Sequence, residues 1–311
     1  MFASLNSHNK IITSQDGEDG IIEFLVNNFN INKTLIEVGS NDGVWLSNTY
    51  NLWHNKKFKA LLIEYDYSCF NKLVKSFSSY KNILCVRNKI HFNDEHIEKE
   101  KLRDSTESDL WTTLDAVAQN NNFQSNVGLL SIDATMLNAK PHPFSYDYHI
   151  LKYLNYLKPQ IIVIGFAYHI PGHLEFIESE DCSFHLLGSS FKSTYNLAKK
   201  KFYQVVAATT NNIIMVNEEI SKKFISLPAE EYFIWGKENP KIKIKSNFFP
   251  IANSHSVAAI YQKNLNLFGK FLAKKIRYKL KLNYNKKNYF PLRKVPNHYI
   301  NHCSQYDIYP I

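Results

Sequence analysis

A short apolar strand that runs into an acidic, glycine-bearing turn constrains this chain more than any other feature of its sequence. Residues 35–43 read LIEVGSNDG, and a second apolar strand, residues 60–64, ends on Glu64. The residues between them can form a helix that contains Leu52 and Trp53. A strand, a helix and a second strand in this order predict the first βαβ unit of a doubly wound parallel sheet. We therefore expect a ligand at the carboxyl ends of these strands.

The alternation of strands and helices continues along the chain. Further strands are expected at residues 83–86, 127–133, 160–165, 203–208 and 213–216. Further helices are expected over residues 21–26, 67–80, 110–120, 146–157 and 193–201. The TTNN turn between the last two strands predicts an antiparallel hairpin. This pattern predicts an α/β fold with a mostly parallel sheet, an antiparallel terminal hairpin and helices on both faces. The charged stretch 91–108 is expected to be an exposed excursion.

Positive charge is concentrated toward the C-terminus. Residues 237–311 hold 15 Lys and Arg against two acids, whereas residues 1–236 hold 22 basic and 26 acidic side chains. We therefore predict an α/β domain over 1–236 and a basic C-terminal extension over 237–311. Apolar residues recur at helical spacing among the lysines of 264–282, which predicts an amphipathic helix. Such a helix fits an anionic membrane surface or packing on the domain, and nucleic acid is the weaker alternative.

Signals for export, metal binding and membrane insertion are absent from the sequence. The four cysteines are scattered without a C-x-x-C pair, and the first ten residues hold no apolar run. No segment reaches the roughly 18 uninterrupted apolar residues of a membrane span. These observations predict a cytoplasmic protein without a zinc site. If the basic helix binds lipid, the protein would be peripheral at the inner membrane.

The acidic turn favours a cationic ligand that carries no phosphate. A phosphate-binding loop would read G-x-G-x-x-G or G-K-[ST], and neither pattern is present. Carboxylates accept hydrogen bonds from ammonium and hydroxyl groups, so a ligand with an amino acid and a ribose fits, with Glu64 on the ribose hydroxyls. S-adenosyl-L-methionine has this composition. The alternative is an α/β protein whose acidic strand ends bind no such ligand.

Several short motifs occur in a fixed order over about residues 13–220. They are SQDGEDG at 14–20, IEVGSNDG at 36–43, SNT at 47–49, LIE at 62–64, LLSID at 129–133, and KKKFY at 199–203 followed by Val205 and Val206. Together they resemble the FkbM-like S-adenosylmethionine-dependent methyltransferases, particularly bacterial members linked to surface polysaccharide and sugar modification. The resemblance implies a Rossmann-like class I methyltransferase fold. It also implies O-methylation of a sugar hydroxyl in a bacterial surface glycan or its precursor.

The same resemblance implies a set of cofactor-binding residues from several strand ends. They are Gln15, Glu18, Glu37, Gly39, Asp42, Ser47, Glu64 and Asn88. The residues of the first turn would line the methionine part of the cofactor. The acid that ends the second strand would bind the ribose, and the asparagine after the third strand would lie near the adenine. The N-terminal pair would cover the site.

Methyl transfer to a hydroxyl requires in-line positioning and a base within hydrogen-bond reach. Asp133 is the first candidate, followed by Asp147, His149 and His169. The alternative for Asp133 is a capping role, and the alternative for the histidines is an ordinary place in loops. A divalent cation held by Asp133 and Asp147 is compatible with the sequence, but no ligand spacing indicates one.

The second half of the chain departs from the family pattern. Gly128 and Gly165 stand where relatives carry acids, and residues 134–140 replace the acid and glycine that usually follow the SID motif. An insertion would explain this change, and Asp147 would then take the place of the second acid. The departures leave two alternatives open. One is a catalytically impaired, methyltransferase-like binding or scaffold protein, and the other is a membrane-docking protein that acts through its basic tail.

Overall fold

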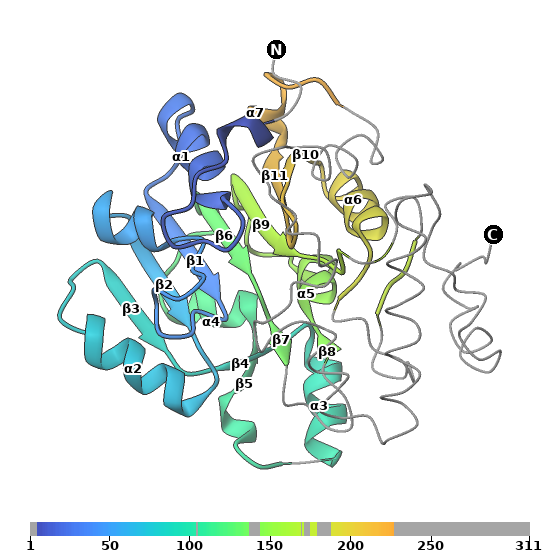
Figure 1. Cartoon of the computed structure of the whole chain (residues 1–311). Coiled ribbons are helices and arrows are strands. Elements are labelled where there is room, and N and C mark those ends of the chain that lie inside the picture. Colours follow the sequence, from blue (N-terminus) through green and yellow to red (C-terminus); the bar gives the residue numbers. More distant parts are fainter. Residues whose placement is uncertain are drawn as a thin grey trace, which may run out of the picture.

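The computed structural model describes residues 5–103, 105–136, 144–168, 170, 175–178 and 188–226. Its central sheet consists of β1 (Thr34–Val38), β2 (Lys59–Ile63), β3 (Ile83–Val86), β6 (Leu129–Ile132), β9 (Ile161–Gly165), β10 (Tyr203–Ala208) and β11 (Asn212–Asn217). The strand order is β10-β11-β9-β6-β1-β2-β3 (Figure 1). All neighbours are parallel except the two pairs made by β11. The predicted Rossmann-like, mostly parallel sheet with an antiparallel hairpin is therefore confirmed.

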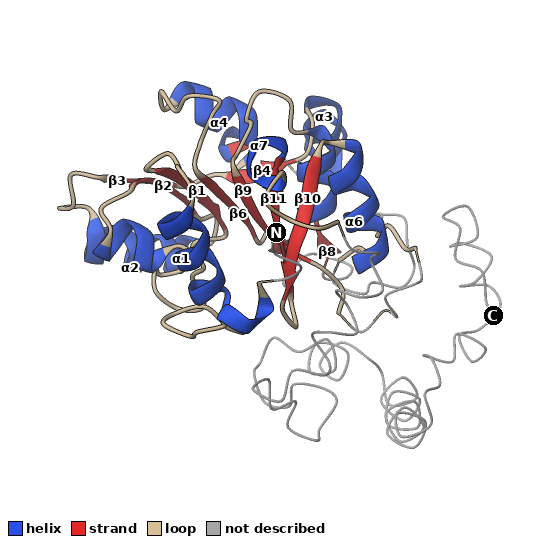
Figure 2. Ribbon diagram, turned by 90° about the horizontal axis from the view of Figure 1, so that it is seen from above, coloured by secondary structure: helices blue, strands red, loops and turns tan. Residues whose placement is uncertain are grey.

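Helices cover both faces of this sheet. They are α1 (Glu18–Asn28), α2 (Tyr67–Phe77), α3 (Asp94–Arg103), α4 (Leu114–Asn120), α5 (Asp147–Tyr153), α6 (Phe191–Lys200) and α7 (Glu218–Ser221). Shorter turns are η1 (Asn6–His8), η2 (Asn51–Asn55) and η3 (Ser108–Leu110). Figure 2 shows α1 and α2 on one side of the sheet and α4 on the other. This is the layered arrangement that alternating strands and helices produce.

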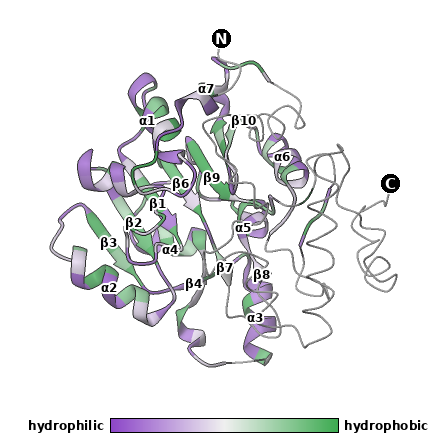
Figure 3. Ribbon diagram, in the orientation of Figure 1, coloured by the Kyte–Doolittle hydropathy of each residue, from purple (hydrophilic) through white to green (hydrophobic). Residues whose placement is uncertain are grey.

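Two apolar cores lie on opposite faces of the sheet because side chains alternate along each strand. In β1, Leu35 belongs to the core that α1 and α2 cover, whereas Ile36 belongs to the core under α4, α5 and α6. The strands are apolar along most of their length, as Figure 3 shows for β1, β2, β6 and β9. Strands that are buried on both faces consist of continuous runs of apolar residues, and such runs can be recognised in the sequence. This explains why the predicted strands agree with the observed ones.

The prediction that residues 91–108 form an exposed excursion is only partly correct, because Leu102 and residues 105–107 are exposed but the stretch also contains buried side chains and regular structure. Strand β4 (Lys89–His91) pairs in parallel with β5 (Trp111–Thr113), and α3 follows β4. His91 and His96 are buried, with 2.8 Å between their Nδ1 atoms, and both rings contact Tyr146. Packing of aromatic and imidazole rings replaces aliphatic residues here, so the stretch lacks the apolar periodicity by which buried elements are recognised.

The helix expected to contain Leu52 and Trp53 is not a regular α-helix in the structure. It is reduced to η2, a five-residue π-helical turn. Ser47 and Thr49 donate their hydroxyl groups to Glu37 in β1. This contact binds the turn to the strand, and the regular α-helix does not form.

Several predictions concern residues outside the part of the chain that the structure describes. These are the C-terminal extension over 237–311, its helix over 264–282, and His169. Within the described residues, none of the helices combines the length and the apolar character that crossing a membrane requires.

Candidate functional site

The carboxyl ends of the parallel strands meet at one edge of the sheet, and the strand order reverses there between β1 and β6. Ligands of open α/β sheets bind in the crevice at this switch point. Gly39 follows β1 with a φ of 78°, and a Cβ added to it would lie 2.0 Å from the main-chain oxygen of Asp133, which follows β6. The glycine is therefore required for the two strand ends to approach each other.

Glu37 lies directly below this turn and is buried. Ser47 Oγ lies 2.9 Å from both carboxylate oxygens, Thr49 Oγ1 donates at 2.8 Å, and the N–H of Asn48 donates at 3.2 Å. Burial raises the pKa of Glu37 from its ordinary 4.5 to about 7, and the charge of Asp133 adds to this rise. The carboxyl group of Glu37, which was expected to face the cofactor, thus accepts hydrogen bonds that connect β1 to the 47–49 turn.

Asp42 and Glu64 shape the crevice through main-chain bonds. Asp42 Oδ1 accepts the N–H groups of Val44 and Trp45 at 3.0 and 2.8 Å. Glu64 accepts the N–H of Asn41 on one oxygen and the N–H of Asp66 on the other, both at 2.7 Å. Burial raises the pKa of Glu64. The N–H of Tyr65 also bonds to this carboxyl group, and because a carboxylate offers about four acceptor positions, it can still accept a further donor such as a hydroxyl group.

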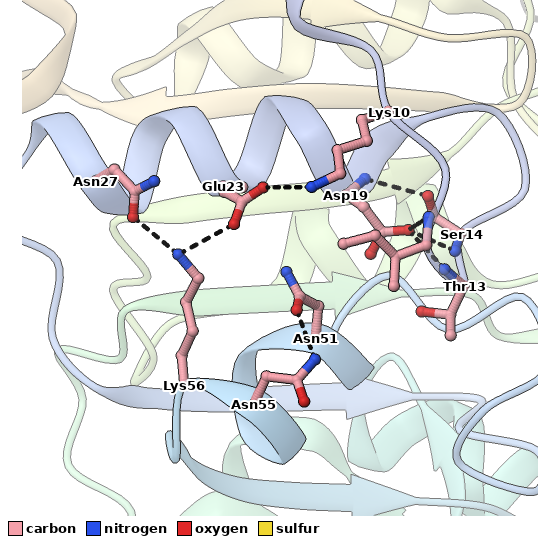
Figure 4. A network of polar contacts seen from close by, with 10 residues as sticks. Lys10, Thr13, Ser14, Asp19, Glu23, Asn27, Asn51, Asn55 and Lys56 are labelled. Carbon is pink, nitrogen blue, oxygen red and sulfur yellow. Dashed lines mark hydrogen bonds and ion pairs between the residues drawn. The ribbon is translucent and has the colours of Figure 1, made fainter.

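An N-terminal loop runs along the same edge and is organised by Asp19. Asp19 Oδ2 accepts the N–H groups of Ile12, Thr13 and Ser14, each at 2.8 Å, and Ser14 Oγ accepts the N–H of Asp19 (Figure 4). Thr13 Oγ1 also donates to the carbonyl oxygen of Ser47 at 3.0 Å. These bonds hold the loop beside the turn that follows β1.

The same loop then reaches the β10–β11 hairpin. Glu18 is fully buried and accepts bonds from Thr209 Oγ1 and Asn212 Nδ2 at 2.5 and 2.9 Å. Asp16 accepts a bond from Asn211 Nδ2 at 2.7 Å. Burial, followed by the charge of Glu18, raises the pKa of Asp16 to about 7. Of the two residues expected to cover the cofactor, Glu18 is thus bonded to the hairpin, and Gln15 is exposed to solvent.

Asn88 lies where β3 ends, on the far side of Glu64. Its Nδ2 donates to the carbonyl oxygen of Leu110 at 3.0 Å. The bond connects the end of β3 to the turn before β5. Gly39, Asp42 and Ser47 thus lie in the segment that follows β1, Glu64 follows β2, and Asn88 lies one strand further along the same edge.

The candidate catalytic residues Asp133 and Asp147 meet at the other side of the crevice. Asp133 is exposed, whereas Asp147 is buried and accepts the N–H of Ala134 on Oδ1 at 2.6 Å. A Cβ added to Gly165 would lie 2.6 Å from Asp147 Oδ2. Burial and then the charge of Asp133 raise the pKa of Asp147 well above its ordinary value. The absent side chain at Gly165 therefore leaves room for a carboxyl group delivered from α5.

Gly128 has a different explanation. It precedes β6, at the amino end of the strand and away from the crevice. A Cβ added there would lie 1.9 Å from the main-chain oxygen of Asn32. Close packing of the backbone accounts for this glycine, so its departure from the family pattern does not remove an acid from the site.

Three acidic residues at this edge were missed by the sequence analysis. Asp16 and Asp19 lie in the SQDGEDG motif, in which only Gln15 and Glu18 were assigned roles, and Ser14 and Asp19 exchange reciprocal hydrogen bonds across five positions. Glu178 is fully buried and offered no signal, because residues 175–178 belong to no helix or strand. His149 Nε2 lies 2.6 Å from the carbonyl oxygen of Glu178. Because a carbonyl oxygen can only accept a hydrogen bond, Nε2 is the donor.

Neither a family model nor a curated protein sequence matches the chain. Among solved structures, the CMeT domain of the citrinin polyketide synthase is 10% identical at a TM-score of 0.36, over 68% of this chain and 52% of that chain. A SAM-dependent methyltransferase from Aquifex aeolicus is 11% identical at 0.31, over 62% and 87%. The N-terminal domain of EvdMO1 with SAH bound is 13% identical at 0.38, over 66% and 82%.

This chain spans about half the length of the citrinin synthase chain. The similarities concern the fold alone, and at these TM-scores they carry no argument about the site. The fold class rests on the strand order of the sheet itself.

Proposed function

We propose that this protein is an S-adenosyl-L-methionine-dependent methyltransferase that transfers a methyl group to a sugar hydroxyl of a bacterial surface glycan or its precursor. One observation carries the proposal. Glu64 follows β2 and Asp133 follows β6, so the strands on both sides of β1 end in a carboxyl group at the switch point, and the turn after β1 lacks a phosphate-binding pattern. The sugar acceptor is supported by the FkbM-like motifs of the sequence.

The residues at the crevice fit such a cofactor in chemical character. Glu64 can accept a ribose hydroxyl on the acceptor positions that its main-chain partners leave. Asn48 Oδ1 is a buried acceptor atom without a hydrogen-bond partner in the structure, beside the 47–49 turn, so it can accept a bond from the ammonium group. Gly39 keeps the backbone close to the crevice floor.

When bound, S-adenosyl-L-methionine supplies an electrophilic methyl group on a sulfonium. The protein then has to hold the acceptor in line and remove the hydroxyl proton. Asp133 is exposed at the end of β6 and is the carboxylate that can accept this proton. Asp147 is buried beside it, and burial and then the charge of Asp133 raise the pKa of Asp147, so Asp147 holds a proton more readily than an exposed carboxyl group does.

Calorimetric titration with S-adenosylhomocysteine tests the cofactor part of the proposal. We expect wild type to bind, and we expect Glu64→Ala and Asp42→Ala to lose roughly tenfold or more in affinity, because a hydrogen bond to a charged group contributes about 1.5–3 kcal/mol. Glu219→Ala is the matched control. This exposed acid lies in α7, after the carboxyl end of the antiparallel β11 and hence at the opposite edge of the sheet. An absence of binding to wild type, or equal binding to all variants, contradicts the proposal.

Catalysis is tested separately, with radiolabelled cofactor and a panel of monosaccharides and glycan precursors. We expect methyl transfer to at least one hydroxyl acceptor, and we expect Asp133→Asn to abolish it while binding S-adenosylhomocysteine as wild type does. Cofactor binding without turnover on any acceptor would instead favour the impaired, methyltransferase-like binding protein.

A further inference from the structure

Glu178 is a fully buried carboxyl group that the proposed chemistry leaves unused. It has no exposed surface, and it lies in the short described stretch 175–178 between β9 and α6. A buried carboxyl group is costly unless hydrogen bonds compensate for the water that it loses. The bonds of Glu178 therefore show which parts of the protein it holds in place.

These bonds gather separate segments around the start of α5. Glu178 Oε2 accepts the N–H groups of Ser145 and Gly188, at 3.0 and 2.9 Å. The N–H of Glu178 donates to Ser189 Oγ at 3.2 Å. Its main-chain oxygen accepts the bond from His149 Nε2 at 2.6 Å. One residue thus joins the two-residue strand β8 (Phe144–Ser145), α5 and the loop before α6.

Ser145 transmits this constraint to Asp147. The N–H of Asp147 donates to Ser145 Oγ at 3.4 Å, and the same hydroxyl group hydrogen-bonds to the Asp147 carboxyl group. Asp147 in turn holds the N–H of Ala134, the residue that follows Asp133. A continuous chain of bonds therefore runs from Glu178 to the exposed end of β6.

The contact with His149 also determines the position of a ring hydrogen. A carbonyl oxygen can only accept, so Nε2 of His149 must carry a hydrogen. The ring packs against Phe92, with 5.1 Å between centroids. Two of the candidate catalytic residues, Asp147 and His149, are thus both oriented by Glu178.

We propose that Glu178 is a positioning residue for the acceptor half of the site, which is the part formed by Asp133, Asp147 and His149. There it orients Asp147 and holds a hydrogen on Nε2 of His149. This role in acceptor binding rests on the proposed methyltransferase function. The effect of Glu178 on its two neighbours can nevertheless be measured without any substrate.

The charges that face Asp147 make the effect measurable. Asp133 and Glu178 are the charged groups that raise the pKa of Asp147, whereas the bonds from the Ala134 N–H and the Ser145 side chain lower it. Removing the negative charge of Glu178 therefore lowers the titration midpoint of Asp147, because a like charge disfavours ionisation. Removing the Ser145 hydroxyl raises it, because a hydrogen bond to the carboxylate is lost.

The experiment is a carbon-13 NMR titration of the Asp147 carboxyl group in the full-length protein. We expect Glu178→Gln to shift the midpoint down by roughly one pH unit and Ser145→Ala to shift it up. Glu175→Gln is the matched control, because Glu175 lies in the same stretch but is exposed and bonds only to Asn196 among the contacts described. Nitrogen-15 spectra of the wild type should show His149 protonated at Nε2.

An unchanged Asp147 midpoint in Glu178→Gln, or a wild-type His149 protonated only at Nδ1, overturns the proposal. If Glu178→Gln fails to fold, the protonation of His149 at Nε2 in wild type still tests the contact between His149 and Glu178. S-adenosylhomocysteine affinity should stay within about twofold of wild type in both variants, because the cofactor half is untouched. A wild type that binds no S-adenosylhomocysteine refutes the proposed function, whereas a normal affinity with unmoved midpoints refutes only the role of Glu178.

Discussion

At the scale of single residues, Glu37 shows how burial changes the role of an acid that the sequence pattern identified. It was expected to line the methionine part of the cofactor, and in the structure Ser47, Asn48 and Thr49 surround its carboxyl group. The position of Glu37 within β1 could be predicted from the sequence, because side chains alternate between the two faces of a strand. The hydroxyl partners come from a turn about ten residues later, and only the folded backbone brings them to the carboxyl group.

The raised pKa of Glu37 predicts a pH dependence of stability. With an ordinary value of 4.5 in the unfolded chain and about 7 in the fold, the folded protein binds more protons between these values. The stabilisation is therefore complete below about pH 4.5 and is lost as the pH rises to about 7, by roughly 3 kcal/mol at most. Glu37→Gln should remove this slope.

Urea unfolding at pH 5 and pH 7.5 measures the effect. The free energy of unfolding should fall more between these pH values in wild type than in Glu37→Gln. Asp16 has a similarly raised pKa and stays in both proteins, so the difference between them isolates Glu37. Identical slopes in the two proteins would contradict the assignment.

At the scale of elements, the N-terminal segment is attached to the far end of the sheet. Asn6 exchanges hydrogen bonds with the backbone of Ala208, and Glu18 accepts bonds from Thr209 and Asn212. The segment therefore spans from the turn after β1 to the β10–β11 hairpin. The sequence identified the loop, the helix and the hairpin separately, but their association joins residues about 190 positions apart.

Glu18→Ala tests this attachment. The change leaves Thr209 and Asn212 without their carboxylate, and we expect a loss of roughly 2–4 kcal/mol in the free energy of unfolding, because buried polar groups lose their partner. Glu23→Ala is the control in the same helix, since Glu23 forms only surface ion pairs with Lys10 and Lys56 (Figure 4). It should cost under about 1 kcal/mol. Equal losses in urea unfolding would show that Glu18 does not hold the hairpin.

At the scale of the whole molecule, charge is distributed unevenly along the chain, with a net negative charge on residues 1–236 and a net positive charge on residues 237–311. Residues 237–311 hold 15 Lys and Arg against two acids, and they lie outside the described structure. The prediction that they bind an anionic surface therefore rests on the sequence alone. Each cation near an anionic membrane contributes about 1 kcal/mol, so several together give measurable binding.

Neutralising part of the tail tests this role in the full-length protein. We expect wild type to float with vesicles that contain anionic lipid but not with neutral vesicles. A variant with Lys270→Gln, Lys274→Gln, Lys275→Gln and Lys279→Gln should lose most of this flotation. S-adenosylhomocysteine binding should be the same in both, because the crevice belongs to residues 37–133. Equal flotation of the two proteins would remove the membrane role.

The sequence by itself determined the strands, their order of alternation with helices, and the acids and glycines at the ends of β1, β2 and β6. The strands are continuous apolar runs and the helices repeat at a period of about 3.6 residues, so neighbouring positions along the chain reveal them. Only the tertiary structure decided which groups those acids meet. It placed Gly128 at the opposite edge, filled the space at Gly165 with the carboxyl group of Asp147, and buried Glu178 beside α5. Burial and hydrogen bonding between distant segments arise when the sheet assembles, and no local pattern encodes them.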